Sequence, residues 1–161
     1  MVSTEKYLLE KLGKLLQIKR LKVAVAESCT GGGIANAMTS LPGSSNWFEC
    51  GFVTYSNQSK NQLLGISEEL INTYGAVSAE TAVAMAEAAL THSRAEMAVA
   101  VTGIAGPDGG TEDKPIGTIY FAWSAIELTT KTTTVIFSGN RETIRNQTIL
   151  MALQGLIERV E

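Results

Sequence analysis

The chain of 161 residues is 45% apolar, which suits a single domain with an ordinary hydrophobic core over residues 1–161. Its net charge of −3 and the lack of a basic run exclude the electrostatic footprint of most nucleic-acid-binding proteins, so no nucleic-acid partner is expected. Two cysteines and one histidine offer no disulfide framework or zinc-ligand spacing, and no apolar run reaches membrane-spanning length, so we expect a cytoplasmic protein without metal or membrane contact.

The first third of the chain predicts two helices and two strands. Ser3 or Thr4 can cap a helix whose leucines recur at helical spacing. A short run rich in Val and Ala at 21–27 is not alternating, as expected of a strand buried on both faces. We expect the next helix over about 30–41, because Pro42 cannot continue it, and a β-rich strand over 47–56.

The remaining elements follow from cap residues and β-rich runs. Ser67 and Ser78 begin helices, the first of which Gly75 ends, and Asn140 lies in the cap of a last helix. We expect a buried strand over 96–101 and an antiparallel pair over 119–125 and 130–137, since the link between the last two is too short for a crossover. The fold class is therefore α/β, a single three-layer α/β/α domain with a mixed, mostly parallel sheet.

Ser28 stands where the first buried strand gives way to the glycines at 31–33. Such a strand-to-helix turn exposes a hydroxyl beside unpaired backbone N–H groups. It suits a nucleophile with an oxyanion site or a phosphate cradle equally well. Glu27, at the end of the strand, is expected to have a structural role, and the long glycine-rich stretch 102–117 is typical of a functional loop.

If Ser28 is a nucleophile, its base has to come from elsewhere in the chain. His92 is the only histidine and is expected at a helix end, so a Ser-His-Asp triad is not favoured. Lys60 beside Tyr55 is the best alternative, provided that burial or a second cation lowers the lysine pKa. From spacing alone, the ordinary interpretation of Lys60 is a solvated lysine on a helix.

Two further sets of charged residues are candidates for ligand binding. Asp108, Glu112 and Asp113 could hold a metal ion, although acids in such a loop are more often solvated. Arg141 and Arg145 share a face in the first turns of the last helix, where they could clamp an anion. Pairing of these arginines with Glu142 or with solvent is an equal alternative.

Five ordered segments of the sequence resemble the CinA C-terminal domain family. They are AESCTGG at 26–32, GFVTYSN at 51–57 with Lys60, GAVS at 75–78, TGIAGPDGG at 102–110 and KPIGT at 114–118. The resemblance spans nearly the whole chain. It implies a homo-oligomer that needs no cofactor and that hydrolyses the carboxamide of nicotinamide mononucleotide, a small-molecule nucleotide, to nicotinic acid mononucleotide and ammonia in pyridine-nucleotide recycling.

The resemblance also implies roles for individual residues. Ser28 becomes the nucleophile, Lys60 the base and Tyr55 a relay or orienting group. The residues implied to bind substrate, the first three of them as oxyanion donors, are Thr30, Gly31, Gly32, Thr102, Gly103, Ala105, Gly106, Arg141 and Arg145. Two alternatives remain open, a catalytically silent nucleotide-binding or regulatory module and a nucleotide phosphohydrolase, although no carboxylate cluster for magnesium is visible.

Overall fold

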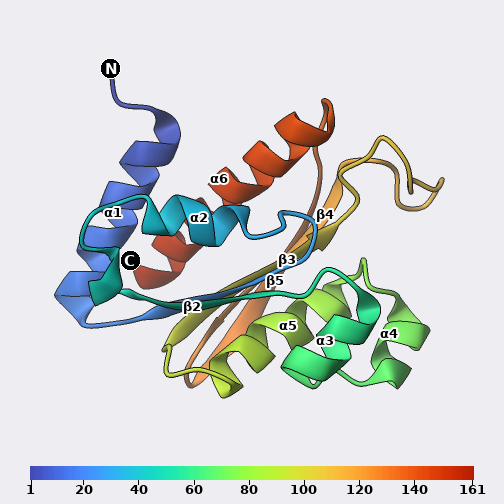
Figure 1. Cartoon of the computed structure of the whole chain (residues 1–161), viewed down its shortest axis with the longest axis horizontal. Helices are drawn as coiled ribbons and strands as arrows, with labels where there is room; N and C mark the ends of the chain where they lie inside the picture. Colours follow the sequence, from blue (N-terminus) through green and yellow to red (C-terminus); the bar gives the residue numbers. More distant parts are fainter.

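The computed structural model describes all residues from 1 to 161, arranged as five strands and six α-helices with one short 3₁₀ turn at Ser44–Asn46 (Figure 1). The strands are β1 (Val23–Glu27), β2 (Phe48–Val53), β3 (Met97–Gly103), β4 (Thr118–Ala125) and β5 (Leu128–Ile136). The helices are α1 (Thr4–Lys19), α2 (Gly33–Thr39), α3 (Asn57–Leu64), α4 (Glu68–Tyr74), α5 (Ala79–Thr91) and α6 (Arg141–Val160).

The strands form one sheet in the order β2-β1-β3-β4-β5. Strand β1 pairs in parallel with β2 and β3, whereas β4 is antiparallel to both β3 and β5. Only β4 therefore runs against the other strands. The predicted mixed, mostly parallel sheet and the antiparallel β4–β5 pair are confirmed.

Helices cover both faces of the sheet, which confirms the three-layer prediction (Figure 1). Helices α1, α2 and α6 pack on one face, where the buried strand residues are large: Val23, Val25, Val99, Val101 and Phe121. Helix α5 covers the other face, where the strand residues are mostly alanines: Ala24, Ala26, Ala98, Ala100 and Ala122. Small side chains let this Ala-rich helix approach the sheet closely. No helix is long and apolar enough to cross a membrane.

Helix α2 begins at Gly33, three residues after the predicted start. Gly31 and Gly32 have positive φ angles of 57° and 99°, outside the right-handed helical region, so residues 28–32 form a turn instead. The first helix begins after Ser3, and α4, α5 and α6 after Ser67, Ser78 and Asn140, as predicted. Before α3 the cap is Ser56, because its hydroxyl accepts the N–H of Ser59, and Asn57 is the first helical residue.

The register of the sheet determines which loops surround Ser28. Glu27, the last residue of β1, pairs with Val53 on β2 and with Val101 on β3. Because these three strands are parallel, the segments that follow them leave the sheet at the same edge. Ser28 therefore lies between the turn after β2 and the glycine-rich loop after β3.

Candidate active site

Ser28 directly follows the last residue of β1 at this edge of the sheet and is almost completely buried. Its backbone N–H donates to Val101 O at 3.1 Å, which ties the turn to β3. Its backbone carbonyl accepts the N–H of Gly31 at 3.1 Å, so residues 28–31 close a tight turn. The hydroxyl is thus presented from a rigid part of the backbone, as a nucleophile requires.

Lys60 is fully buried, so the interpretation of this residue as a solvated helix lysine is wrong. Helix α3 starts close to the end of β2, and Lys60, on its first turn, points back toward β1. The ammonium group contacts Ser28 Oγ at 2.9 Å, Thr54 O at 2.6 Å and Tyr55 O at 3.4 Å. The structure therefore brings the predicted nucleophile and the predicted base into direct hydrogen-bond contact.

Burial lowers the pKa of Lys60 to about 8. Desolvation is the dominant cause, and no carboxylate lies within ion-pairing distance to oppose it. A neutral amine has two N–H donors and one lone pair. Two carbonyls, of Thr54 and Tyr55, can accept the donors, which leaves the lone pair to accept the proton of Ser28 Oγ.

The lowered pKa predicts how stability changes with pH. Between the folded pKa of about 8 and the ordinary value of 10.5, the unfolded chain binds a proton that the folded chain does not, so this lysine makes stability rise with pH over that range. The raised pKa of Cys29 acts in the opposite direction above pH 9. We therefore expect the melting temperature of the wild type to rise relative to that of Lys60→Met as pH increases from about 8 to about 10. If the melting temperatures of the two proteins changed with pH in the same way, the Lys60 pKa would not be lowered in the folded protein.

Glu27 is fully buried, and its carboxylate caps the N-terminal end of helix α2. Its carboxylate accepts the hydroxyl of Thr30 at 2.6 Å and the backbone N–H groups of Ile34 and Ala35 at 2.8 and 3.0 Å. This confirms the structural role expected for Glu27. It also corrects the expectation that the first N–H groups of the helix are unpaired, because the Glu27 carboxylate accepts those of Ile34 and Ala35.

Free backbone donors nevertheless remain beside Ser28. The N–H groups of Cys29 and Thr30 donate to no acceptor of another residue. Thr30 is completely buried, whereas Cys29 lines the same cavity as Ser28. The thiol of Cys29 is inert, because burial raises its pKa to about 12. Of these two N–H groups, that of Cys29 belongs to the residue that follows the nucleophile and lines the cavity.

Ser28 and Lys60 open into a cavity of about 270 Å³. Among the sequence-predicted residues, those that line it are Ser28, Tyr55, Lys60, Thr102, Gly103, Ala105, Gly106 and Arg141. Thr30, Gly31, Gly32 and Arg145 do not line it. The cavity is also lined by Asp108, which was considered only as a metal ligand, and by residues not predicted to belong to the site: Cys29, Ala76, Val77, Ile104 and Gly109.

Arg141 connects two sides of the cavity mouth. Its guanidinium donates to Gly106 O at 2.7 Å and to the hydroxyl of Tyr55 at 3.1 Å. The Tyr55 side chain is 61% exposed, and its hydroxyl contacts neither Ser28 nor Lys60. Since a guanidinium has five donors, Arg141 can still bind an anion at the mouth.

The wall formed by Ala76 and Val77 is held in place by two side chains from elsewhere. The hydroxyl of Thr102 donates to Ala76 O at 2.7 Å, and the ammonium of Lys114 donates to Val77 O. Thr102 thus lines the cavity and also holds its neighbouring wall. The segment 75–78 was one of the five ordered segments, so its presence in the sequence was the signal that could have included it in the predicted site.

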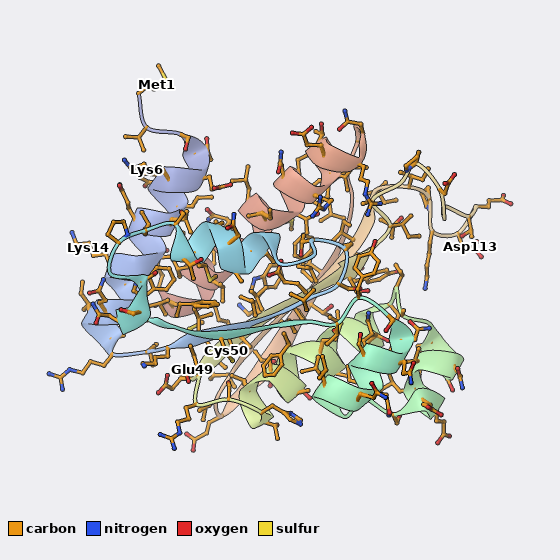
Figure 2. All side chains as sticks on the ribbon, in the orientation of Figure 1. Met1, Lys6, Lys14, Glu49, Cys50 and Asp113 are labelled. Atoms are coloured by element: carbon orange, nitrogen blue, oxygen red, sulfur yellow. The ribbon has the colours of Figure 1, made fainter.

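The acidic residues of the glycine-rich loop do not converge. No group of three or more His, Cys, Asp or Glu side chains is arranged to hold a metal ion. Asp113 lies at the far end of the loop between β3 and β4, which projects away from the sheet (Figure 2). Asp108 alone of the three acids lines the cavity, which Arg141 also lines. The cavity lining therefore includes one acidic side chain from this loop and the guanidinium of Arg141.

The chain is similar to known proteins over nearly its whole length. The family model described as the CinA C-terminal domain matches residues 5–160. Nicotinamide-nucleotide amidohydrolase PncC of Escherichia coli (strain K12) is 48% identical over 147 residues, 91% of this chain and 89% of that protein. The protein of the same name from Pseudomonas putida is 49% identical over 148 residues, 92% of each chain. The crystal structure of competence/damage inducible protein CihA from Agrobacterium tumefaciens has a TM-score of 0.95 and 42% identity, covering 98% of this chain and 96% of that chain.

Proposed function

The chain belongs to the CinA C-terminal domain family, and we propose from this premise that it is a nicotinamide-nucleotide amidohydrolase. It hydrolyses the carboxamide of nicotinamide mononucleotide to nicotinic acid mononucleotide and ammonia. The observation that carries the proposal is the contact of 2.9 Å between buried Lys60 and Ser28 Oγ. A module that only binds a nucleotide needs a cavity but has no need for a desolvated amine against a hydroxyl.

The first half of the reaction forms an acyl-enzyme. Neutral Lys60 takes the proton of Ser28 as Oγ attacks the carboxamide carbon. The carbonyl oxygen becomes an oxyanion, for which the free N–H of Cys29 is the adjacent donor. Lys60 then returns the proton to the amide nitrogen, the C–N bond breaks, and ammonia leaves.

The second half regenerates the enzyme. Lys60, neutral again, takes a proton from a water molecule that attacks the ester carbon. The tetrahedral species collapses with cleavage of the bond to Ser28 Oγ, which regains its proton from Lys60. The products are the free enzyme and the pyridine carboxylic acid, which loses its proton to water or ammonia to become the carboxylate, so one water is consumed for each ammonia released. No cofactor enters this sequence of steps.

The experiment that tests the function is an assay of ammonia release from nicotinamide mononucleotide, with product identified by mass spectrometry. Formation of nicotinic acid mononucleotide in equal amount to ammonia supports the proposal. A protein that binds the nucleotide without releasing ammonia would favour the silent regulatory module. Metal-dependent release of phosphate or pyrophosphate instead of ammonia would favour the phosphohydrolase.

Arg141 is the proposed anchor for the substrate phosphate, because it is the cation that lines the cavity mouth and has donors to spare. A lost charge-assisted hydrogen bond costs about 1.5–3 kcal/mol, which is about tenfold to 100-fold in kcat/KM. We expect Arg141→Ala to lose this much activity on the mononucleotide and little on nicotinamide riboside. Tyr55→Phe distinguishes the two contacts of Arg141, because it removes the hydroxyl of Tyr55 and leaves the hydrogen bond to Gly106 O in place. Equal losses on both substrates would instead indicate that Arg141 only holds the loop at Gly106.

Three broader parts of the proposal come from family membership. They are a role in pyridine-nucleotide recycling, a homo-oligomeric state and a cytoplasmic location. The role in recycling can be tested by whether deletion of the gene raises cellular nicotinamide mononucleotide. Light scattering on the purified protein tests the oligomeric state.

A further inference from the structure

Arg145 makes two hydrogen bonds to the backbone of the turn that carries Ser28. Its Nε donates to Cys29 O at 3.2 Å and its Nη2 to Thr30 O at 2.9 Å. The side chain forms no ion pair with any carboxylate. It lies outside the catalytic cavity, in a separate hollow between α2 and α6. Arg145 therefore acts on the turn and has no direct access to the substrate.

Each of these contacts fixes a peptide plane. The C=O and N–H of a trans peptide point in opposite directions within one plane. Holding Thr30 O with Arg145 therefore directs the N–H of Gly31, which donates to Ser28 O. The Ser28 C=O and the Cys29 N–H belong to one peptide group, so holding Ser28 O directs the Cys29 N–H to the opposite side. The two peptide groups form a series that begins at the guanidinium and ends at the free N–H of Cys29.

The hydrogen bond from Arg145 Nε to Cys29 O fixes the peptide group that follows Cys29. Because Nε holds Cys29 O, both peptide planes that meet at the Cα of Cys29 are restrained. The positive φ of 57° at Gly31 comes directly after this N–H and turns the chain from the tight turn toward helix α2. A Cβ at Gly31 would also lie 3.5 Å from Arg145 Nη2. The turn and the arginine are thus fitted to one another.

We propose that Arg145 is a positioning residue that orients and polarises the N–H of Cys29 as the oxyanion donor. The inference rests on the proposed amide hydrolysis at Ser28. A cation on the first carbonyl polarises hydrogen bonds in series, which strengthens the last donor. A fixed donor also needs no reorganisation when charge develops on the carbonyl oxygen of the substrate. The two arginines one turn apart on α6 therefore have different duties, Arg141 toward the substrate and Arg145 toward the turn.

The test compares Arg145→Lys and Arg145→Ala with a matched control on the same helix. Arg159 also donates its guanidinium to a loop carbonyl, that of Thr129, but far along α6 from the cavity. We expect kcat on nicotinamide mononucleotide to fall about tenfold to 100-fold in both Arg145 variants, with KM changed less than about twofold. Added guanidinium should restore part of the kcat of Arg145→Ala. Arg159→Lys should retain wild-type values.

A second substrate separates this inference from the proposed function. Acetylation of Ser28 by 4-nitrophenyl acetate, followed as a mass increase on the peptide that contains Ser28, also passes through an oxyanion but needs no nucleotide. If the wild type is acetylated and both Arg145 variants are slowed, the inference stands even where ammonia release from the mononucleotide fails. An increase in KM with unchanged kcat would overturn it in favour of substrate binding. Losses that guanidinium does not restore, together with a lowered melting temperature, would overturn it in favour of a purely structural role.

Discussion

Replacement of Ser28 by alanine should reduce ammonia release at least about 10³-fold, because the variant keeps the cavity but cannot form the acyl-enzyme. Ser28 is the only hydroxyl in contact with Lys60. The loss should appear in kcat, while binding of the product nucleotide, measured by calorimetry, should stay close to that of the wild type. The substitution removes one oxygen from a turn held by backbone hydrogen bonds, so the fold should persist.

The matched control for this variant is Ser40→Ala. The hydroxyl of Ser40 bonds the carbonyl of Ala37 at the end of α2, away from the cavity. Its removal should leave kcat and KM unchanged. In a trapping experiment, hydroxylamine added during turnover should divert the acyl group to a hydroxamate in the wild type and not in Ser28→Ala. Substantial ammonia release by Ser28→Ala would exclude Ser28 as the nucleophile.

The order and type of the secondary-structure elements could be predicted because their signals are local. Cap residues such as Ser67 and Asn140 satisfy helix N–H groups within three residues of themselves. Buried strands are continuous apolar runs rich in Val and Ala, which the absence of alternating polar residues identifies. The predicted start of α2 was wrong because Gly31 and Gly32 have positive φ angles, and the first N–H groups of the helix are satisfied by Glu27, seven and eight residues earlier in the chain. No local rule for helix caps covers that distance.

The candidate site was predictable in part, and the limit is again the range of the interactions. Ser28 has a local signal, a strand that ends at three glycines. The burial of Lys60 has none, because it depends on β1 lying beside β2 and α3 folding back along them. From sequence alone this residue is one of many polar residues in a short helix. The resemblance to a family supplied the assignment that spacing could not.

The arginine pair shows the same limit in another form. Helical spacing correctly predicts that Arg141 and Arg145 lie on one face of α6. Whether two residues on one face meet one ligand depends on what lies opposite each of them. Here Arg141 faces the glycine-rich loop and Arg145 the Ser28 turn, so the structure divides what the sequence had grouped. Neither arginine pairs with Glu142, the alternative that spacing left open.

Lys60→Arg should be inactive although it keeps the positive charge, because a guanidinium does not lose its proton near neutral pH. For the wild type, kcat/KM should rise with pH up to the Lys60 pKa of about 8 and level off above it, since only the neutral amine accepts the proton of Ser28. Below that pKa the expected slope is about tenfold for each pH unit. A carboxylate base would level off several units lower.

A buried arginine can also disturb the fold, so Lys60→Ala provides the second test of the base. In that variant, added ethylamine should restore activity, because a small neutral amine can occupy the vacated space beside Ser28, whereas ethylguanidinium should not. The rate with a series of amines should follow the basicity of each amine, as for general-base catalysis. Lys22→Arg, on the surface near Glu49, is the matched control and should behave as wild type.

An active Lys60→Arg enzyme with an unchanged pH profile would contradict the assignment of Lys60 as the base and would indicate that it binds substrate. Ser28 would then need another base, and Tyr55 could supply it only if its side chain left Arg141 and turned into the cavity.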